Sequence, residues 1–264
     1  MFDWLQKLLT PPRAIPDALW QLTLAQYPFL TSRPIADQTR LRTLTAQFLA
    51  QKQFSGAHDL VITDEMAVAI AAQACLPVLN LGLKLYDDFK GIVVHPGAML
   101  ARRSIVDPAG VHHFYKEALA GEAMEGGPVT LSWQDVVPCH EHRARGYNVV
   151  IHEFVHKIDM RDGTPNGCPP LPTRVAKVAW QSTMQAAYES FQHQVVMAER
   201  FDAEPPWLDA YGATSPAEFF AVASEAYFVN PSRFELEFES LKTLFDTFFK
   251  QMSGYALLTR PTTA

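Results

Sequence analysis

The chain has 264 residues, 48% of them hydrophobic, and is therefore long enough to bury a sizeable core. With 22 Lys and Arg against 28 Asp and Glu, its net charge of −6 gives no reason to expect direct binding to nucleic acid or to an anionic membrane. The three cysteines show no CxxC spacing, and the opening sequence MFDWLQKLLTPPRAIP lacks the pattern of a secretory signal. We therefore expect a cytoplasmic protein without a disulfide framework.

The first third of the chain is expected to be helical. Leu and Ala recur at helical spacing over about residues 17–52 and again over 64–85. The apolar stretch MAVAIAAQACLPVLNLGL, residues 66–83, approaches the length of a membrane span, but polar residues and a proline interrupt it. Two adjoining buried helices, split near Pro77, are expected instead.

The middle of the chain is expected to supply a small sheet. The runs over 89–100 and 126–137 are rich in β-branched residues and bounded by Gly and Pro, as strands are. The run PVTLSW, residues 128–133, is expected to be one of these strands. No repeat or linker is visible, so we predict one domain over residues 1–264, with a mainly helical portion up to residue 88.

The stretch YNVVIHEFVHKIDMRDG, residues 147–163, is typical of a buried helix, because its apolar residues form one broad stripe and a glycine stands at its end. The preceding segment CHEHRARG, residues 139–146, is expected to be a polar surface loop. Helical spacing returns over 173–200, 216–228 and 231–252. The aromatic side chains of the last segment are expected to pack in the core.

The buried helix carries the pattern HExxH. Residues four apart differ by about 40° in azimuth, so His152 and His156 present their imidazoles on one face. A catalytic zinc ion takes three protein ligands and a water, and Glu153 can reach that water as a general base without being a ligand. The alternative, two histidines without a metal, would cost several kcal/mol in so apolar a helix unless they were paired. The pattern therefore predicts a hydrolytic site with one zinc ion per chain.

The third zinc ligand is ambiguous from spacing alone. Glu218 and Glu225 lie seven residues apart on one face of the helix expected over 216–228, so both are candidates. Glu218 also stands three residues after Ser215, where it would complete a capping box. The residues alone leave these two glutamates evenly matched.

Four blocks of the sequence, HEFVHKIDMRDG, GGPVTLSW, DAYGATSPAEFF and CLPVLNLGL, resemble the Mlc titration factor A family of bacterial zinc peptidases. The similarity covers most of the chain and implies an α+β, zincin-like fold of the gluzincin type, with a small mixed sheet and surrounding helices. It also implies that His152, His156 and Glu218 hold the zinc, that Glu153 is the catalytic glutamate, and that Tyr211 faces the metal. The family's activity implies an aminopeptidase acting on short peptides. By analogy with zincins, the run PVTLSW is the candidate for a sheet edge that receives an extended peptide.

Three further residues have roles that the sequence leaves open. Tyr211 could donate its O–H to the oxyanion of an attacked carbonyl or merely pack against its loop. Asp159 and Glu225 could each accept an imidazole N–H and so fix a tautomer, or serve only the fold. The resemblance also implies a second class of function, in which the protein binds and sequesters an Mlc-type transcriptional repressor and thereby affects glucose uptake. A structural zinc is disfavoured because such sites usually have four protein ligands.

Overall fold

The computed structural model describes residues 13–106 and 112–250, apart from the side chains of residues 100–118. The opening segment, expected not to be a secretory signal, lies mostly outside these residues. Among the described helices, none combines the length and the apolar character needed to cross a membrane.

The N-terminal portion is helical, as predicted. Its elements are α2 (Asp17–Gln26), η1 (Pro28–Leu30), α3 (Ile35–Gln51), α4 (Asp64–Cys75) and η2 (Leu83–Tyr86). Thr63 caps α4, because its side chain accepts the backbone N–H of Met66. The second helix expected after Pro77 is wrong: residues 76–81 form bends and turns, and Gly82 adopts a left-handed φ of 85°.

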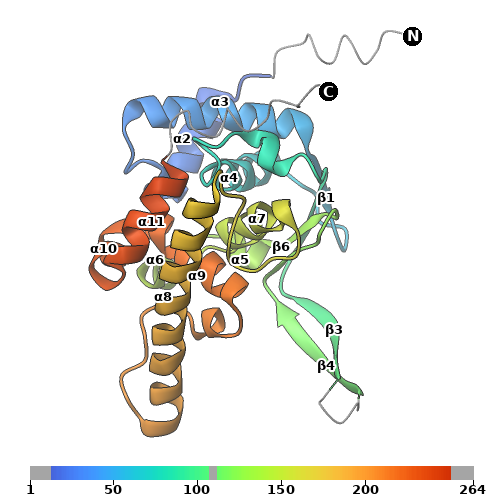
Figure 1. The fold of residues 1–264 in the computed structure, drawn as a ribbon. Coiled ribbons are helices and arrows are strands. Elements are labelled where there is room, and N and C mark those ends of the chain that lie inside the picture. The colour runs from blue at the N-terminus through green and yellow to red at the C-terminus, as the bar shows by residue number, and fades with distance from the viewer. Residues whose placement is uncertain (1–12, 107–111, 251–264) are drawn as a thin grey trace, which may run out of the picture.

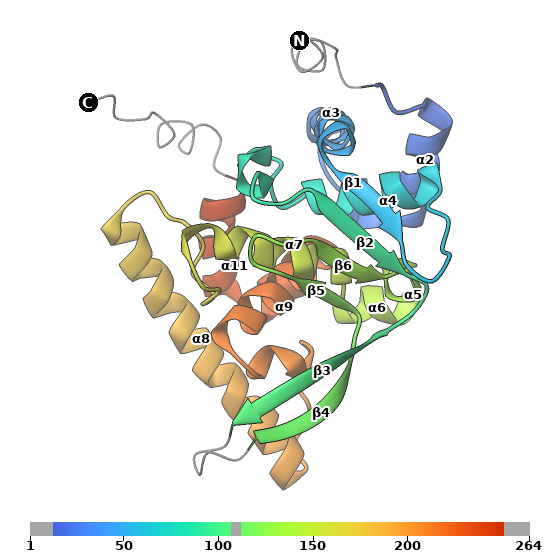
Figure 2. The same ribbon diagram turned by 90° about the vertical axis from the view of Figure 1, so that its right-hand side faces the viewer.

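A mixed sheet of four strands follows. Its order is β1 (Gln53–Gly56), β2 (Gly91–His95), β6 (Val129–Ser132) and β5 (Gly121–Ala123) (Figure 2). The first three strands are parallel, and β5 runs antiparallel to β6 with Gly121 opposite Leu131. Together with the helices, this sheet confirms the α+β class.

The prediction that PVTLSW forms a sheet edge is wrong. Strand β6 is hydrogen-bonded to β2 on one side and to β5 on the other. Its β-branched and apolar residues are typical of a strand that is covered on both faces, because Val129, Leu131 and Ser132 are all buried. The edge beside β6 is formed by the short strand β5, which the sequence did not reveal.

A long antiparallel hairpin leaves the body of the molecule between β2 and β5. It consists of β3 (Met99–Val106) and β4 (His112–Leu119), with Met99 opposite Leu119. Figure 1 shows the pair of strands projecting away from the helices. The strand expected over 89–100 is therefore split between β2 and the start of β3.

From residue 133 to residue 250, the described part of the chain consists of helices and the loops that join them. The helices are α5 (Trp133–Val136), α6 (His140–Arg145), α7 (Val149–Asp159), η3 (Met160–Asp162), α8 (Arg174–Phe201), η4 (Ala210–Ala213), α9 (Pro216–Val229), α10 (Pro231–Glu237) and α11 (Glu239–Phe249). Most of the segment CHEHRARG forms helix α6 rather than a loop, and none of the residues of this helix is buried. The expected helix over 231–252 is two helices up to Phe249, because Phe238 leaves the helical conformation with φ −139° and ψ 55°; residues 251 and 252 lie outside the described residues.

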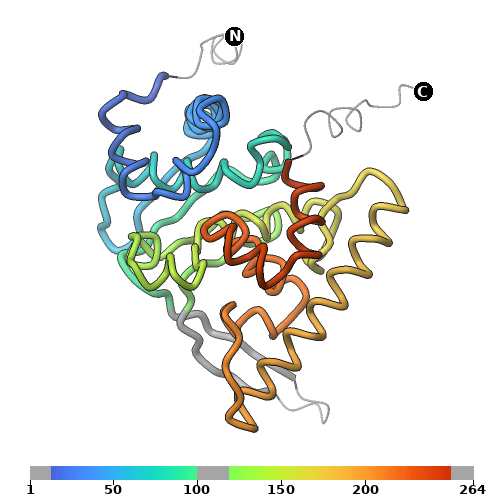
Figure 3. The backbone as a smooth tube through the Cα atoms, turned by 90° about the vertical axis from the view of Figure 1, so that its left-hand side faces the viewer, coloured from blue at the N-terminus to red at the C-terminus, as the bar shows by residue number. Residues whose placement is uncertain are grey.

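Helix α7 runs through the centre of the fold, and every one of its residues is buried. It packs against α4 on one side and against α9 on the other, and Figure 3 shows the N-terminal and C-terminal helices on opposite sides of it. The C-terminal aromatic residues form core, as expected: Phe245 stacks on Trp180 with ring centroids 5.7 Å apart, and both are buried. The central helix is thus held rigidly from both sides.

Candidate metal centre

Helix α7 positions the histidine pair. It begins at Val149 because the side chain of Asn148 accepts the backbone N–H of Ile151 at 2.9 Å. His152 and His156 follow one turn apart on the same face, with ring centroids 4.8 Å apart. Their Nε2 atoms are 3.1 Å apart, so the two rings converge on one point as the HExxH spacing predicts.

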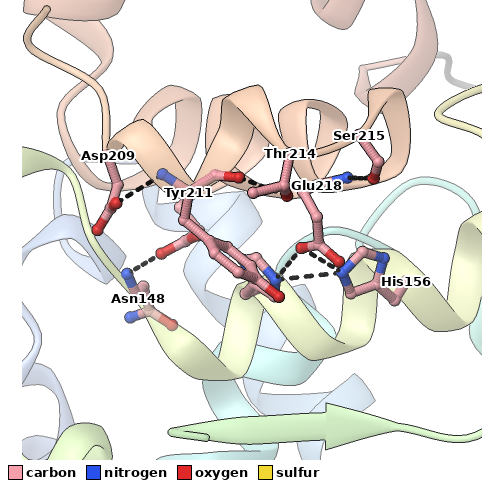
Figure 4. A network of polar contacts seen from close by, with 9 residues as sticks. Asn148, His156, Asp209, Tyr211, Thr214, Ser215 and Glu218 are labelled. Carbon is pink, nitrogen blue, oxygen red and sulfur yellow. Dashed lines mark hydrogen bonds and ion pairs between the residues drawn. The ribbon is translucent and has the colours of Figure 1, made fainter. Parts of the chain in front are cut away.

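Glu218 completes the group from helix α9. Ser215 caps this helix by accepting the backbone N–H of Glu218 at 3.2 Å. The Glu218 carboxylate does not close a capping box; its Oε2 lies 3.0 Å from Nε2 of His152 and 3.1 Å from Nε2 of His156. Figure 4 shows Glu218 and His156 pointing toward one another from the two helices. Within the described residues, these are the three side chains that could hold a metal ion together.

Glu225 lies on the other side of His152. Its Oε1 is 2.7 Å from Nδ1 of His152, and its Oε2 accepts the backbone N–H of Asn148. It is almost wholly buried. The structure therefore separates the two candidate glutamates, because Glu218 faces the converging nitrogens whereas Glu225 meets the opposite ring nitrogen. This is the supporting contact left open for Glu225.

The donor set fits a metal ion. Glu225 accepts the Nδ1 proton of His152, which leaves Nε2 available as a ligand in the neutral ring. Four-coordinate zinc with bonds of about 2.0–2.1 Å keeps its ligand atoms about 3.3 Å apart. The three donor atoms lie 3.0–3.1 Å from one another, close to that spacing.

The charges in the metal-free site are consistent with this fit. Burial alone would lower the pKa of His152, but its hydrogen bonds to Glu218 and Glu225 outweigh burial and raise that pKa well above its ordinary value. Burial would likewise raise the pKa of Glu218, yet the two imidazoles hold it far below its usual range. Both pKa shifts thus favour positive charge at the point where the three donor atoms converge.

Glu153 is held beside the group but does not join it. It is 5% exposed, and burial raises the pKa of its carboxyl group to about 7. The backbone of Gly121 in β5 lies directly against it, because a Cβ at Gly121 would come within 2.4 Å of Oε1 of Glu153. A buried carboxyl group with such a pKa can exchange a proton near neutral pH.

A cavity of about 240 Å³ opens beside these residues. Its lining residues are Leu119, Ala120, Gly121, Tyr147, Val149, His152, Glu153, Asp209, Tyr211, Val222 and Glu225. Tyr211 descends from η4 toward α7, as Figure 4 shows, and its ring centroid lies 6.1 Å from that of His152. The backbone N–H of Tyr211 is donated to Asp209 at 2.9 Å, which orders the turn. The cavity is therefore lined by a phenol, a buried glutamate and the first histidine of the pair, His152.

Asp159 does not take the role considered for it at the histidines. Its Oδ2 accepts the backbone N–H groups of Asn166 and Gly167 at 2.9 and 2.7 Å, and no described imidazole donates to it. Its place on the histidine face of α7 is as the spacing indicates, but its partners belong to the loop that follows η3. Sequence spacing could not identify backbone partners of this kind.

Lys157 was missed by the sequence reasoning. It follows His156, is fully buried, and donates to the carbonyl oxygen of Met124 at 2.8 Å. Its Nζ also lies 2.9 Å from Oδ2 of Asp88. The turn after β5 is thereby fastened to the helix that carries the histidines. A lysine within an otherwise apolar helical stretch was the signal, because a buried ammonium group requires partners.

Comparison with known proteins agrees with this arrangement. A family model for the glucose-regulated metallo-peptidase M90 matches residues 2–250. The chain therefore belongs to this family of metallopeptidases, whose members require a metal ion, and the three converging side chains form a group that could bind one.

Two relatives are similar over nearly the whole chain, and both carry the name Mlc titration factor A. The protein of Serratia proteamaculans (strain 568) is 37% identical over 241 residues, which cover 91% of this chain and 89% of the relative. The protein of Yersinia pestis (strain Pestoides F) is 34% identical over 252 residues, which cover 95% and 90%. The resemblance inferred from the sequence blocks is thus confirmed.

Proposed function

We propose that the protein is a zinc-dependent peptidase in which His152, His156 and Glu218 bind one zinc ion. The observation that carries the proposal is the convergence of two Nε2 atoms and one carboxylate oxygen at 3.0–3.1 Å. Imidazole and carboxylate are ligands that zinc prefers, and three protein ligands leave a position for water. Bound there, zinc would polarise the substrate carbonyl and lower the pKa of the water to about 7.

Glu153 is proposed as the general base. Its carboxylate adjoins His152 and lines the same cavity, so it can take a proton from the attacking water and return it to the leaving amine. Burial keeps it dry and raises the pKa of its carboxyl group to about 7, which suits a group that both accepts and donates a proton.

Tyr211 is proposed to stabilise the transition state. Its ring stands over His152, where the phenol can donate a hydrogen bond to the oxygen of the scissile carbonyl as negative charge develops. The edge strand β5 is proposed to bind extended substrate along its outer side, because it stands at the end of the sheet and Gly121 lies directly against Glu153. This role passes to β5 from β6, which the structure places inside the sheet.

The finer specificity rests on the family resemblance. We propose aminopeptidase action on short peptides, and a cavity of about 240 Å³ suits one substrate side chain rather than a long segment. The proposed compartment is the cytoplasm. This is consistent with three free cysteines, two of them buried, and with a repressor as partner.

The test of this proposal compares wild type with Glu153→Gln on a panel of aminoacyl anilides and short peptides. Removal of a general base is expected to lower kcat by roughly 100-fold or more. The zinc content should stay equal, since all three proposed ligands remain. Glu199→Gln, on the exposed face of α8, is the matched control and should behave as wild type. Equal hydrolysis by wild type and Glu153→Gln would contradict the proposed base.

A second function is favoured by the relatives' name, Mlc titration factor A. In this alternative the protein binds an Mlc-type transcriptional repressor and withdraws it from its operators, which links the protein to glucose uptake. A repressor pull-down that survives Glu153→Gln, together with a cellular phenotype that also survives it, would favour binding. A phenotype abolished by this substitution would favour hydrolysis.

A further inference from the structure

Asp159 ties the end of the histidine helix to the loop that follows it. It is the last residue of α7, its side chain has no exposed surface, and its Oδ2 accepts two backbone N–H groups. These come from Asn166 at 2.9 Å and from Gly167 at 2.7 Å. Both bonds go to the same buried oxygen, while Oδ1 has no hydrogen-bond partner, so these two charge-assisted bonds are the carboxylate's hydrogen bonds to the loop and fix its backbone.

Gly167, one of these two loop residues, also supports the start of helix α9. Gly167 has a left-handed φ of 77°, and a Cβ on it would lie 2.4 Å from the carbonyl oxygen of Pro216. Its own carbonyl oxygen accepts the indole N–H of Trp180 at 2.8 Å. The backbone of Gly167 is therefore clamped between Asp159 and Trp180 and lies directly against the first residue of α9.

Pro216 stands two residues before Glu218 in the first turn of α9. The far end of this helix is held separately, because Glu225 contacts His152 and the backbone N–H of Asn148. The first turn, which carries the proposed ligand, rests on Gly167 instead. A shift of Gly167 would move Glu218 relative to the two Nε2 atoms without disturbing the contact of Glu225.

We propose that Asp159 is a positioning residue that sets the affinity for the metal ion by fixing Glu218, through Gly167 and Pro216, although it does not touch the ion. This inference rests on the proposed function, since it assumes that Glu218 is a ligand. The route starts and ends on the metal group: it runs along α7 from His156 to Asp159, across the loop, and back along α9 to Glu218.

The first experiment measures zinc affinity by competition with a chromophoric chelator. Asp159→Ala removes both loop bonds and is expected to weaken zinc binding about 10- to 100-fold, the usual effect of losing a residue that supports a ligand. Asp159→Asn keeps an oxygen that can accept both N–H groups, so it should stay within about threefold of wild type. Asp162→Asn is the control: Asp162 is the last residue of η3, just before the loop, and pairs with Lys177 at 3.3 Å on the surface.

A second variant keeps the test decisive if Asp159→Ala does not fold. Gly167→Ala leaves Asp159 in place but adds a Cβ that must displace Pro216. It is expected to weaken zinc binding in the same direction. The visible absorption of the cobalt-substituted protein supplies a readout that a purely structural role would not change, because it reports ligand number and geometry. Both variants should shift this spectrum toward that of Glu218→Gln.

The outcomes separate this inference from the proposed function. Unchanged zinc affinity in Glu218→Gln would overturn the ligand assignment, and the inference with it. Weakened binding in Glu218→Gln, with wild-type affinity and cobalt spectrum in folded Asp159→Ala or in Gly167→Ala, would overturn the inference alone. An equal loss of affinity in the Asp162→Asn control would also overturn it, because the effect would then not pass through Gly167.

Discussion

Oε1 of Glu225 lies 2.7 Å from Nδ1 of His152, while Oε2 of Glu218 lies 3.0 Å from Nε2 of the same ring. One imidazole is thus held between two glutamates of a single helix, seven residues apart. The outer carboxylate orients the ring and increases the basicity of the nitrogen that faces the metal group. The two glutamates that the sequence could not tell apart therefore have different tasks at opposite edges of one histidine.

Glu225→Gln should weaken zinc binding about 10- to 100-fold, because it removes the carboxylate behind a ligand. It should also change the number of protons that the protein releases when zinc binds. In the metal-free protein the two carboxylates raise the pKa of His152 well above its ordinary value and so favour its protonated form, whose Nε2 proton must leave when zinc binds there. Without Glu225 this pKa falls and fewer protons are released.

Calorimetry of zinc binding at pH 7 in buffers of different ionisation enthalpy measures this release. Glu235→Gln, exposed on α10, is the matched control. Equal proton release by wild type and Glu225→Gln would contradict the account of His152.

Tyr211→Phe should lower kcat while leaving the bound zinc unchanged. A single donor to a developing oxyanion is worth about 3 kcal/mol, or roughly 100-fold in rate. Tyr27→Phe is a suitable control, since the hydroxyl group of Tyr27 donates to the carbonyl of Val136, outside the cavity. Steady-state kinetics with an aminoacyl anilide decides the matter, and an unchanged kcat would remove Tyr211 from the mechanism.

Gly121→Ala should damage catalysis through Glu153. The added Cβ would lie 2.4 Å from Oε1 of Glu153, so either the carboxylate or strand β5 must move. Misplacement of a catalytic group by about 1 Å can cost about 100-fold in rate. Gly97→Ala is the control, because its Cβ meets only the flexible end of Gln134 at 3.2 Å. If both variants have wild-type kcat and equal zinc content, the close contact is not required.

Lys157→Met should destabilise the metal-free protein. It leaves Asp88 with Arg161 at 3.5 Å as its remaining partner. Breaking a fully buried pair costs about 3–5 kcal/mol, and the cost here should be lower because Asp88 is partly exposed. The double variant Lys157→Met/Asp88→Asn should recover much of this loss, since no buried charge is left unpaired and Arg161 is partly exposed. Lys177→Met breaks an exposed pair with Asp162 and should cost less than about 1 kcal/mol. Urea unfolding measures the free energy of unfolding of all three variants. Equal stability of Lys157→Met and Lys177→Met would contradict the proposed contribution of the contact between Lys157 and Asp88.

Sequence reasoning located the elements whose pattern is strong. The helix of His152 and His156 was predicted because its apolar stripe and its terminal glycine agree, and Ser215 and Pro216 correctly marked the start of α9. The helix break at Phe238 was missed because no glycine or proline signals it. The extra helix predicted after Pro77 failed because helical composition continues there although the backbone turns.

The site was predictable only as far as spacing reaches. A spacing of four residues on one helix places His152 and His156 on the same face. The choice between Glu218 and Glu225 depends instead on how α7 and α9 cross, which no local pattern encodes. Gly121 was overlooked because a strand of three residues, Gly121–Ala123, has almost no β-propensity of its own. The partners of Asp159 are backbone amides seven and eight residues away, and such contacts arise only from the folded loop.

The shortness of strand β5 limits how a substrate can gain affinity. If substrate binds along β5 as proposed, the register with β6 directs the backbone groups of Gly121 and Ala123 outward, so the strand offers at most about four hydrogen bonds, each worth roughly 1 kcal/mol net in water. A longer peptide therefore gains no further backbone hydrogen bonds to this strand. Its affinity for the protein should stop rising after a few residues. Discrimination among peptides then falls to the side chain that enters the cavity beside His152.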